Sequence, residues 1–217
     1  MTETLAGVTA PGFAEPVHDA QIVFRAALTA LSEPGRVIAL PDEIVAGLPS
    51  GQPVGPAALA LLLALADGDT PLWLDGPAGT AADFLRFHTG ASIAAEPSAA
   101  RFALVADAAA CPRLDRFALG DETYPDRSAT VILEAAGLSA PGPLGLSGPG
   151  IDAGIDVGID VGIEGRRSLA IAGLARHFLA DWAANHALFP RGVDILVTCG
   201  GRLCGLPRSV RLEGSCM

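Results

Sequence analysis

The chain has 217 residues, of which 50% are hydrophobic and 18% charged, so it has enough apolar side chains for a packed core and is not of the disordered class. Its formal net charge of −10, with a sequence pI near 4.7, disfavours binding to the phosphate backbone of nucleic acids. All fourteen basic residues are arginine, which excludes a pyridoxal phosphate Schiff base, a Walker lysine and any lysine nucleophile.

The first predicted element is an amphipathic helix that begins near Val17. Polar residues such as Arg25 fall on one face at helical spacing. The opposite face, which is predicted to be buried, carries Ala20, Phe24, Ala27 and Leu31. Pro34 cannot continue the helix and Gly35 allows the backbone to turn, so residues 36–40 are predicted to enter the core as a buried strand.

The next part of the chain is predicted to contain a loop, two helices and a short strand. The loop at 41–56 is rich in glycine and proline and leaves room for at most one helical turn. Residues 57–66 are nearly all apolar and predict a helix that is buried on almost every side. Residues 72–74 predict a strand, and Thr80 is predicted to cap a following helix that runs to Phe87.

The middle of the chain predicts strands separated by an irregular segment. Residues 101–107 alternate weakly and predict one strand, and residues 129–134 are β-branched and apolar, which predicts an inner strand. The segment 108–126 mixes proline, glycine and charged residues and is predicted to be irregular. Residues 144–147 form a further candidate strand.

Residues 150–165 form an internal repeat in which GID recurs every four residues. Isoleucine and valine fall on one parity, which favours a lengthened strand or hairpin, with local disorder as the alternative. The acidic residues of the repeat suggest calcium, but their spacing fits neither an EF-hand loop nor a glycine-rich nonapeptide repeat. We therefore expect no metal here.

The last third of the chain predicts a second long amphipathic helix and a hairpin. The helix is assigned to residues 169–186. The hairpin comprises residues 193–199, a turn at Gly200 and Gly201, and residues 202–206.

Cysteine and histidine side chains offer no strong catalytic or zinc-binding pattern. Cys199 and Cys204 are separated by the predicted turn, so buried or incidental thiols are favoured over a four-cysteine zinc site. His177 and Asp181 lie four residues apart and are predicted to form a solvated pair on one helix face. No serine lies in a nucleophile elbow.

Four stretches of the sequence together resemble one known family. They are VHDAQ…FR…LSEPG from Val17, LADGDTPLWL ending at Leu74, LRFHTG from Leu85, and FPRGVDILVTCG from Phe189. In this order they are similar to PhnH, the H subunit of bacterial carbon-phosphorus lyase. The resemblance runs from about Val17 to Arg208.

The resemblance implies an α/β fold of one domain over residues 17–212, with tails at 1–16 and 213–217 and the repeat at 150–165 as an insertion. It implies a sandwich with a mixed central sheet flanked by helices, similar to the large domain of pyridoxal-phosphate transferases but without that cofactor. We expect no other cofactor.

The function implied by the resemblance is that of a subunit in phosphonate catabolism. The family joins the G, I and J subunits in a core complex. It is associated with the step in which methylphosphonate displaces adenine from ATP to give α-D-ribose 1-methylphosphonate 5-triphosphate. A homodimer is expected when the chain is isolated, and a phosphonate or nucleotide is a candidate ligand.

Several charged or polar residues in or near these stretches are candidates for ligand or interface contacts, because a phosphonate or triphosphate needs strong donors. The candidates are Arg25, Arg36, Arg86, His88, Asp194 and Arg208. The alternative for the arginines is a set of structural ion pairs within the chain or at a subunit interface. No residue is assigned a catalytic role.

Two hypotheses follow for the role of the chain. In the first it is a structural and binding subunit, since no nucleophile, base and orienting group occur together in the sequence. In the second it supplies substrate-binding or catalytic residues at a shared interface. The N-terminal residues lack the basic and apolar regions of a signal peptide and no apolar run is long enough to cross a bilayer, so we expect a cytoplasmic protein without membrane partners.

Overall fold

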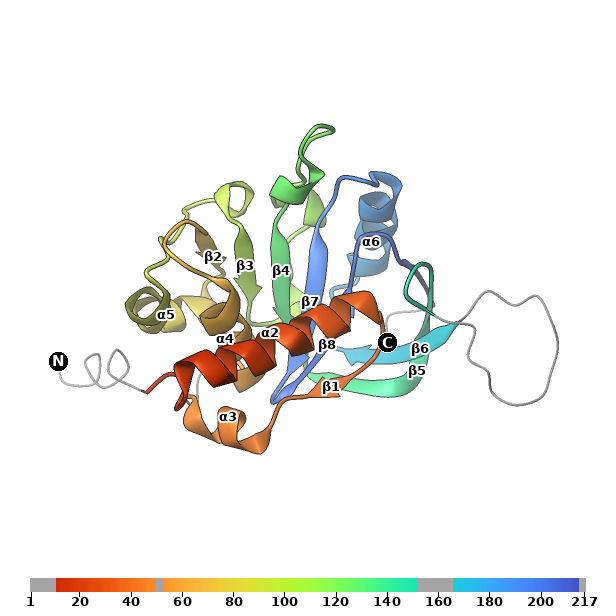
Figure 1. The fold of residues 1–217 in the computed structure, drawn as a ribbon. Helices are drawn as coiled ribbons and strands as arrows, with labels where there is room; N and C mark the ends of the chain where they lie inside the picture. Colours follow the sequence, from red (N-terminus) through yellow and green to blue (C-terminus); the bar gives the residue numbers. More distant parts are fainter. Residues whose placement is uncertain (1–10, 50–52, 152–165, 215–217) are drawn as a thin grey trace.

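The computed structural model describes residues 11–49, 53–151 and 166–214 and has an α/β fold (Figure 1). Over these residues a six-stranded mixed sheet has the order β1-β8-β7-β4-β3-β2, and a three-stranded sheet has the order β6-β5-β9. The large sheet comprises β1 (Ile38–Ala39), β8 (Arg202–Leu206), β7 (Asp194–Cys199), β4 (Thr130–Glu134), β3 (Phe102–Val105) and β2 (Leu72–Leu74). The small sheet comprises β5 (Gly137–Ser147), β6 (Arg167–Ala172) and β9 (Arg211–Glu213).

Four neighbouring strands of the large sheet, β2, β3, β4 and β7, are parallel. Their carboxyl ends therefore lie at one edge, where open α/β sheets commonly hold ligands. β8 pairs antiparallel with β7 through the predicted glycine turn, with Cys199 opposite Arg202. β1 closes this side of the sheet by antiparallel pairing with β8.

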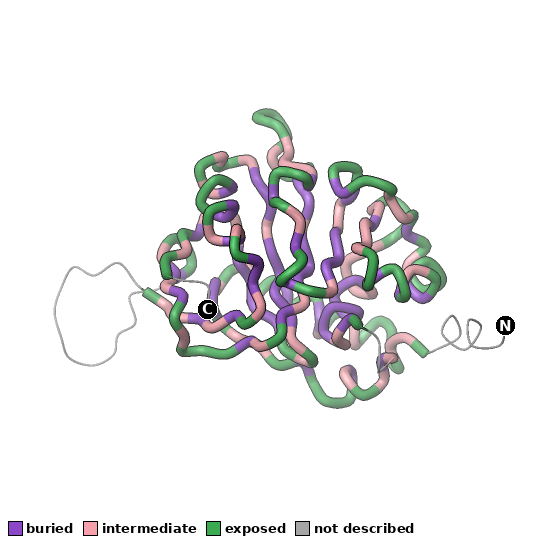
Figure 2. The backbone as a smooth tube through the Cα atoms, turned by 180° about the vertical axis from the view of Figure 1, so that it is seen from behind, coloured by how far each residue is buried: buried purple, intermediate pink, exposed green. Residues whose placement is uncertain are grey.

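Helices cover both faces of the large sheet because alternate strand residues point to opposite sides. Leu104, Ile132 and Leu196 pack with four helices on one face. Those helices are α2 (Pro16–Ser32), α3 (Asp42–Gly47), α4 (Pro56–Leu65) and α5 (Ala82–Thr89). The other face packs against α6 (Phe178–Ala187) and the small sheet. Figure 2 shows the buried residues concentrated along the central strands. None of the described helices is long and apolar enough to cross a membrane.

The long first helix, α2, is where the sequence predicts it, but its buried face is different. Val23, Ala27 and Ala30 are buried, whereas Phe24 is 47% exposed. The reason is the close approach of α2 to β8, where a Cβ atom on Gly205 would collide with the carbonyl oxygen of Ala30. Only small side chains fit between two backbones this close, so the bulky Phe24 is turned outward.

The predicted helix over residues 169–186 is wrong in its first half. β6 (Arg167–Ala172) occupies that part and pairs with β5, and α6 starts only at Phe178. Leu169 and Ile171 are buried on alternate positions, as in a strand, and Gly173 turns the chain with φ +84°. The alternation of apolar and other residues covers only four positions here, which is too short to distinguish a strand from a helix by periodicity.

Three shorter predictions also need correction. β1 has two residues and lies at the sheet edge, with Ile38 half-buried and Ala39 exposed, rather than forming a buried strand. Thr80 does not cap α5, because its hydroxyl bonds the carbonyl of Pro77 inside the 3₁₀ helix η1 (Pro77–Ala81). The predicted loop at 41–56 contains α3, which is longer than one turn.

The remaining elements agree with the predictions or differ from them only in length and local detail. α4 is buried from Ala57 to Leu62, as its composition predicts. The irregular segment 108–126 contains the short 3₁₀ helices η3 (Ala108–Ala110) and η4 (Leu114–Arg116) and the start of η5 (Pro125–Arg127). β5 is longer than the predicted strand at 144–147. Most of the GID repeat, residues 152–165, lies outside the described residues.

Candidate functional site

The candidate residues chosen from the sequence do not form one site. Asp194 and Arg208 contact each other at the start of β7 and just after β8. Arg86 and His88 lie on α5, and Arg25 is exposed on α2. The remaining candidate, Arg36, follows α2 at the entrance to β1. The six residues therefore sit in four separate places.

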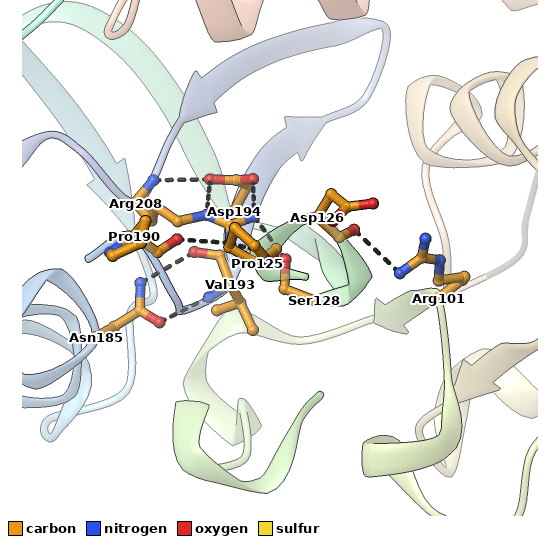
Figure 3. A network of polar contacts seen from close by, with 9 residues as sticks. All are labelled: Arg101, Pro125, Asp126, Ser128, Asn185, Pro190, Val193, Asp194 and Arg208. Atoms are coloured by element: carbon orange, nitrogen blue, oxygen red, sulfur yellow. Dashed lines mark hydrogen bonds and ion pairs between the residues drawn. The ribbon is translucent and has the colours of Figure 1, made fainter. Parts of the chain in front are cut away.

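Asp194 and Arg208 form an internal polar network (Figure 3). The Arg208 Nη2 and Nε atoms donate to the two Asp194 carboxylate oxygens at 2.6 and 3.1 Å. Nη1 also donates to the carbonyl oxygens of Pro125 and Pro190, and Nη2 donates to the Ser128 hydroxyl. The guanidinium is thus satisfied by the chain itself, which supports the structural alternative for this arginine.

Two further arginine candidates form short-range ion pairs. Arg36 Nη1 lies 2.8 Å from a Glu33 carboxylate oxygen, and Arg86 Nη1 lies 3.2 Å from Asp83. Both pairs are exposed, and such pairs contribute little to stability. His88 is exposed and packs against the Phe84 ring, with 4.6 Å between centroids.

The carboxyl edge of the parallel strands is occupied by the chain's own carboxylate, Glu134. It accepts hydrogen bonds from the Thr198 hydroxyl at 2.5 Å and the Gly200 amide at 3.2 Å. A Cβ atom on Gly55, at the amino end of α4, would collide with this carboxylate. Burial raises the pKa of Glu134, while the hydrogen bonds from Thr198, Gly200 and Gly55 partly lower it. Glu134 therefore lies beside a helix amino terminus, the kind of position that binds phosphate in other proteins.

Three arginines line one surface cleft of about 540 Å³, which we call the arginine cleft. They are Arg36, Arg167 and Arg202, and Glu33 is the only acidic residue among the described residues of the lining. Arg167 Nη1 donates to the carbonyls of Glu33 and Pro34 at 3.0 and 2.9 Å, which fixes it to the turn after α2. The cleft has an excess of guanidinium groups and suits an anion.

Sequence reasoning found only Arg36 among these three arginines. Arg167 follows the GID repeat, and no local pattern indicates that it returns to the turn at Pro34. Arg202 is adjacent to this region because β8 pairs with β1, which places Arg202 opposite Ala39. Both contacts depend on long-range pairing, which the residue pattern does not reveal.

His177 and Asp181 form the predicted pair, but the pair is not solvated as predicted. The two side chains meet at 3.0 Å, and the Asp181 side chain is only 4% exposed. Asp181 is buried because it also binds the Arg113 guanidinium at 3.3 Å and the Leu114 amide at 3.4 Å. A half-exposed imidazole is thus oriented by a buried carboxylate.

A nucleophile does not accompany this pair among the described residues. Burial, together with the charges of Asp181 and Asp75, raises the pKa of the Cys111 thiol to about 12. Burial likewise raises the pKa of Cys204 to about 12. Both buried thiols therefore stay protonated near neutral pH and are poor nucleophiles. Over the described part of the chain, no group of three or more potential ligand side chains could hold a metal ion.

Comparison with known proteins gives the same family as the sequence motifs. The model of the family described as "Bacterial phosphonate metabolism protein (PhnH)" matches residues 11–213. A relative from Rhizobium meliloti (strain 1021), the alpha-D-ribose 1-methylphosphonate 5-triphosphate synthase subunit PhnH, is 40% identical over 206 residues. The match covers 93% of this chain and 94% of the relative. The chain therefore belongs to the PhnH family of bacterial phosphonate metabolism proteins.

Proposed function

We propose that this chain is a subunit of the synthase that makes α-D-ribose 1-methylphosphonate 5-triphosphate from ATP and methylphosphonate. The observation that carries the proposal is the 40% identity to a subunit of that synthase over 93% of this chain. The match leaves no large part of either protein unaccounted for. Within the carbon-phosphorus lyase core complex, the partners of this chain would be the G, I and J subunits.

The role we infer within the complex is structural and ligand-binding rather than catalytic. Two of the three described thiols are buried and protonated, and the His177–Asp181 pair has no nucleophile beside it within the described ranges. The Glu134 carboxylate accepts the hydrogen bonds of Thr198 and Gly200 at the carboxyl edge, where a phosphate would otherwise compete for them. These features favour chemistry on the partner subunits.

Three further parts of the proposal concern the location of the protein, its oligomeric state and its fold. We infer that the chain is a cytoplasmic protein and forms a homodimer when its partners are absent. We also infer that its α/β sandwich is similar to the large domain of pyridoxal-phosphate transferases. The absence of lysine from the sequence is consistent with a version of that fold that does not carry the cofactor.

Co-expression with the G, I and J subunits tests the subunit assignment. The complex is purified through an affinity tag on this chain alone, and its composition is measured by native mass spectrometry. We expect the three partners at a fixed ratio to this chain. The assignment fails if this chain elutes alone while the other three assemble without it.

A second candidate role is to hold the anionic substrate at a shared interface, and the arginine cleft is the observation that favours it. Arg202 is exposed and forms no ion pair within the described residues, so its guanidinium is available to a phosphonate or phosphate group. Arg202→Gln is expected to raise the KM of the assembled synthase for methylphosphonate or ATP without loss of the partners. An unchanged KM for both substrates excludes this role.

A further inference from the structure

A second cleft, separate in its lining from the arginine cleft, lies beside the edge strand β2 and has a volume of about 430 Å³. Its wall is mostly apolar and is formed by Trp73, Ala95, Pro97 and Pro112. Its polar lining consists of Glu96, Arg113 and Arg116. We call it the tryptophan cleft. Its volume falls in the range of small-molecule sites in proteins.

Trp73 is a fixed and partly exposed aromatic wall of this cleft. Its ring meets Phe117 edge to face, with 5.9 Å between centroids and 77° between planes. Its indole N–H has no acceptor among the described residues, whereas the N–H of the buried Trp182 donates to the Val210 carbonyl at 2.9 Å. A rigid indole with a spare donor is well suited to contact a planar polar ring.

Arg113 is held at the cleft by a buried carboxylate. Its Nη2 atom lies 3.3 Å from Asp181 Oδ1. Asp181 is itself fixed by His177 at 3.0 Å and by the Leu114 amide at 3.4 Å. Arg113 Nε also lies 3.6 Å from a carboxylate oxygen of Asp115, so two carboxylates restrain the guanidinium. The Arg113 side chain is 62% exposed, so a ligand phosphate can still reach it from the solvent side. The His177–Asp181 pair thus acts here as a support for an arginine.

Arg116 and Glu96 complete the polar part of the tryptophan cleft. Their charged groups are 3.8 Å apart, and both side chains are more than 60% exposed, at 65% and 69%. This weak pair leaves the guanidinium free to exchange its partner for a ligand phosphate. The Glu96 carboxylate is an acceptor for an amino group on a ring.

We propose that the tryptophan cleft binds a purine nucleotide, with the base against Trp73 and the phosphate on Arg113 and Arg116. Stacking on an aromatic side chain recognises the base, and two guanidinium groups recognise the phosphate. A free phosphate would leave the apolar wall unused. The proposal rests on this cleft alone and not on the assignment of the chain to the synthase.

Tryptophan fluorescence of the isolated full chain tests the proposal directly. The chain has two tryptophans, and Trp182 is 1% exposed, so quenching on ligand addition reports Trp73. AMP is expected to quench the signal saturably, while ribose 5-phosphate, which lacks the base, is not. Trp73→Phe is expected to remove the quenching while the circular dichroism spectrum stays unchanged.

Arginine variants locate the phosphate contact. Arg116→Gln is expected to weaken AMP binding about tenfold, as loss of a charge-assisted hydrogen bond requires. Arg25→Gln removes the same charge from an exposed position on α2 and is expected to leave the affinity unchanged.

Two results overturn the proposal. One is the absence of saturable quenching at millimolar AMP. The other is AMP binding that Arg202→Gln abolishes and Arg116→Gln leaves intact, which would place the nucleotide in the arginine cleft. Neither result bears on co-purification with the partner subunits, so this proposal and the subunit assignment fail independently.

Discussion

Arg208 donates hydrogen bonds from all three guanidinium nitrogens, and each of these acceptors belongs to the chain itself. Its side chain is 13% exposed and that of Asp194 is 22% exposed, so the ion pair is largely shielded from water. The network joins β7, the end of the β8 segment and the loop at Pro125. It therefore fixes the β7–β8 hairpin to a loop that lies 83 residues before Arg208 in the sequence.

Replacement of Arg208 by lysine is predicted to destabilise the fold although the charge is kept. A lysine cannot make the paired contact with Asp194 and also reach Pro125 and Ser128. We expect the free energy of unfolding to fall by about 2 kcal/mol or more, measured by urea denaturation. Arg86→Lys is the matched control, because its pair with Asp83 is exposed, and it is expected to change stability by less than about 0.5 kcal/mol. Equal effects of the two variants would contradict the structural role of Arg208.

Glu134 gives the chain a predicted pH dependence of stability. Its pKa is raised above 4.5 in the fold, mainly by burial, so the folded state favours the protonated carboxyl. The contribution of this group is therefore greatest below 4.5 and is lost as the pH rises through the raised value. Glu134→Gln, which resembles the protonated acid, is predicted to gain stability relative to the unchanged protein as the pH rises through that window.

Denaturation curves of both proteins on either side of this window test the Glu134 prediction. Thr198 can accept a hydrogen bond from the glutamine amide and donate to the Leu133 carbonyl, 3.5 Å away, so the variant keeps its hydrogen bonds. Glu134→Ala is the control that loses them. A stability difference that does not change with pH would show that the Glu134 pKa is not raised.

Sequence reasoning at the scale of single residues identified plausible groups but not their partners. Arg208 and Asp194 stand out by residue type, yet only the antiparallel pairing of β7 with β8 shows that they neutralise each other. Asp181 was wrongly predicted to be solvated. Its partner Arg113 lies 68 positions earlier in the chain, so the sequence around Asp181 does not reveal the contact. Contacts of this kind depend on the fold and have no local signal.

At the scale of elements, the position of α2 is set by backbone proximity rather than by its largest apolar side chains. Ala27 and Ala30 face the sheet, while Val17, Phe24 and Leu28 are 76%, 47% and 52% exposed. The hydrophobic periodicity of the sequence contains two apolar stripes, and only the one with small residues fits against β8. Sequence periodicity predicts the helix but cannot choose between the stripes.

Gly205→Ala is predicted to separate α2 from β8. The added methyl group would collide with the Ala30 carbonyl oxygen, which belongs to the rigid helix backbone and cannot move without shifting α2. We expect a loss of about 1 to 3 kcal/mol in the free energy of unfolding, measured by thermal and urea denaturation. Gly47→Ala is the control, since nothing lies within 4 Å of its added Cβ atom, and it is expected to be neutral. Unchanged stability in Gly205→Ala would contradict the packing of α2 described above.

The central strands β4, β7 and β8 were predicted more closely than the helix boundaries. β4 and the β7–β8 hairpin follow from apolar β-branched runs and the Gly200–Gly201 turn, and they are confirmed within one or two residues. β6 was assigned to a helix because its apolar alternation merges with that of α6. Its strand conformation is stabilised by pairing with β5, which is a tertiary contact.

At the scale of the whole molecule, the family resemblance predicts an α/β protein but does not fix the order of the strands in the sheet. β4 lies beside β7, although β5, β6 and α6 separate them in the sequence. The arginine cleft depends on this order as well, because it gathers residues from the end of α2, the small sheet and β8. The family motifs predicted the general architecture, while the clefts became visible only in the folded chain.

We propose that the chain supports synthesis of α-D-ribose 1-methylphosphonate 5-triphosphate without supplying a catalytic group. The most direct test is adenine release from ATP and methylphosphonate by the partner subunits, with and without this chain. We predict that omission lowers the rate sharply and that both the unchanged chain and His177→Asn restore it. The claim is contradicted if the partners reach the full rate without this chain, or if His177→Asn abolishes adenine release in an intact complex.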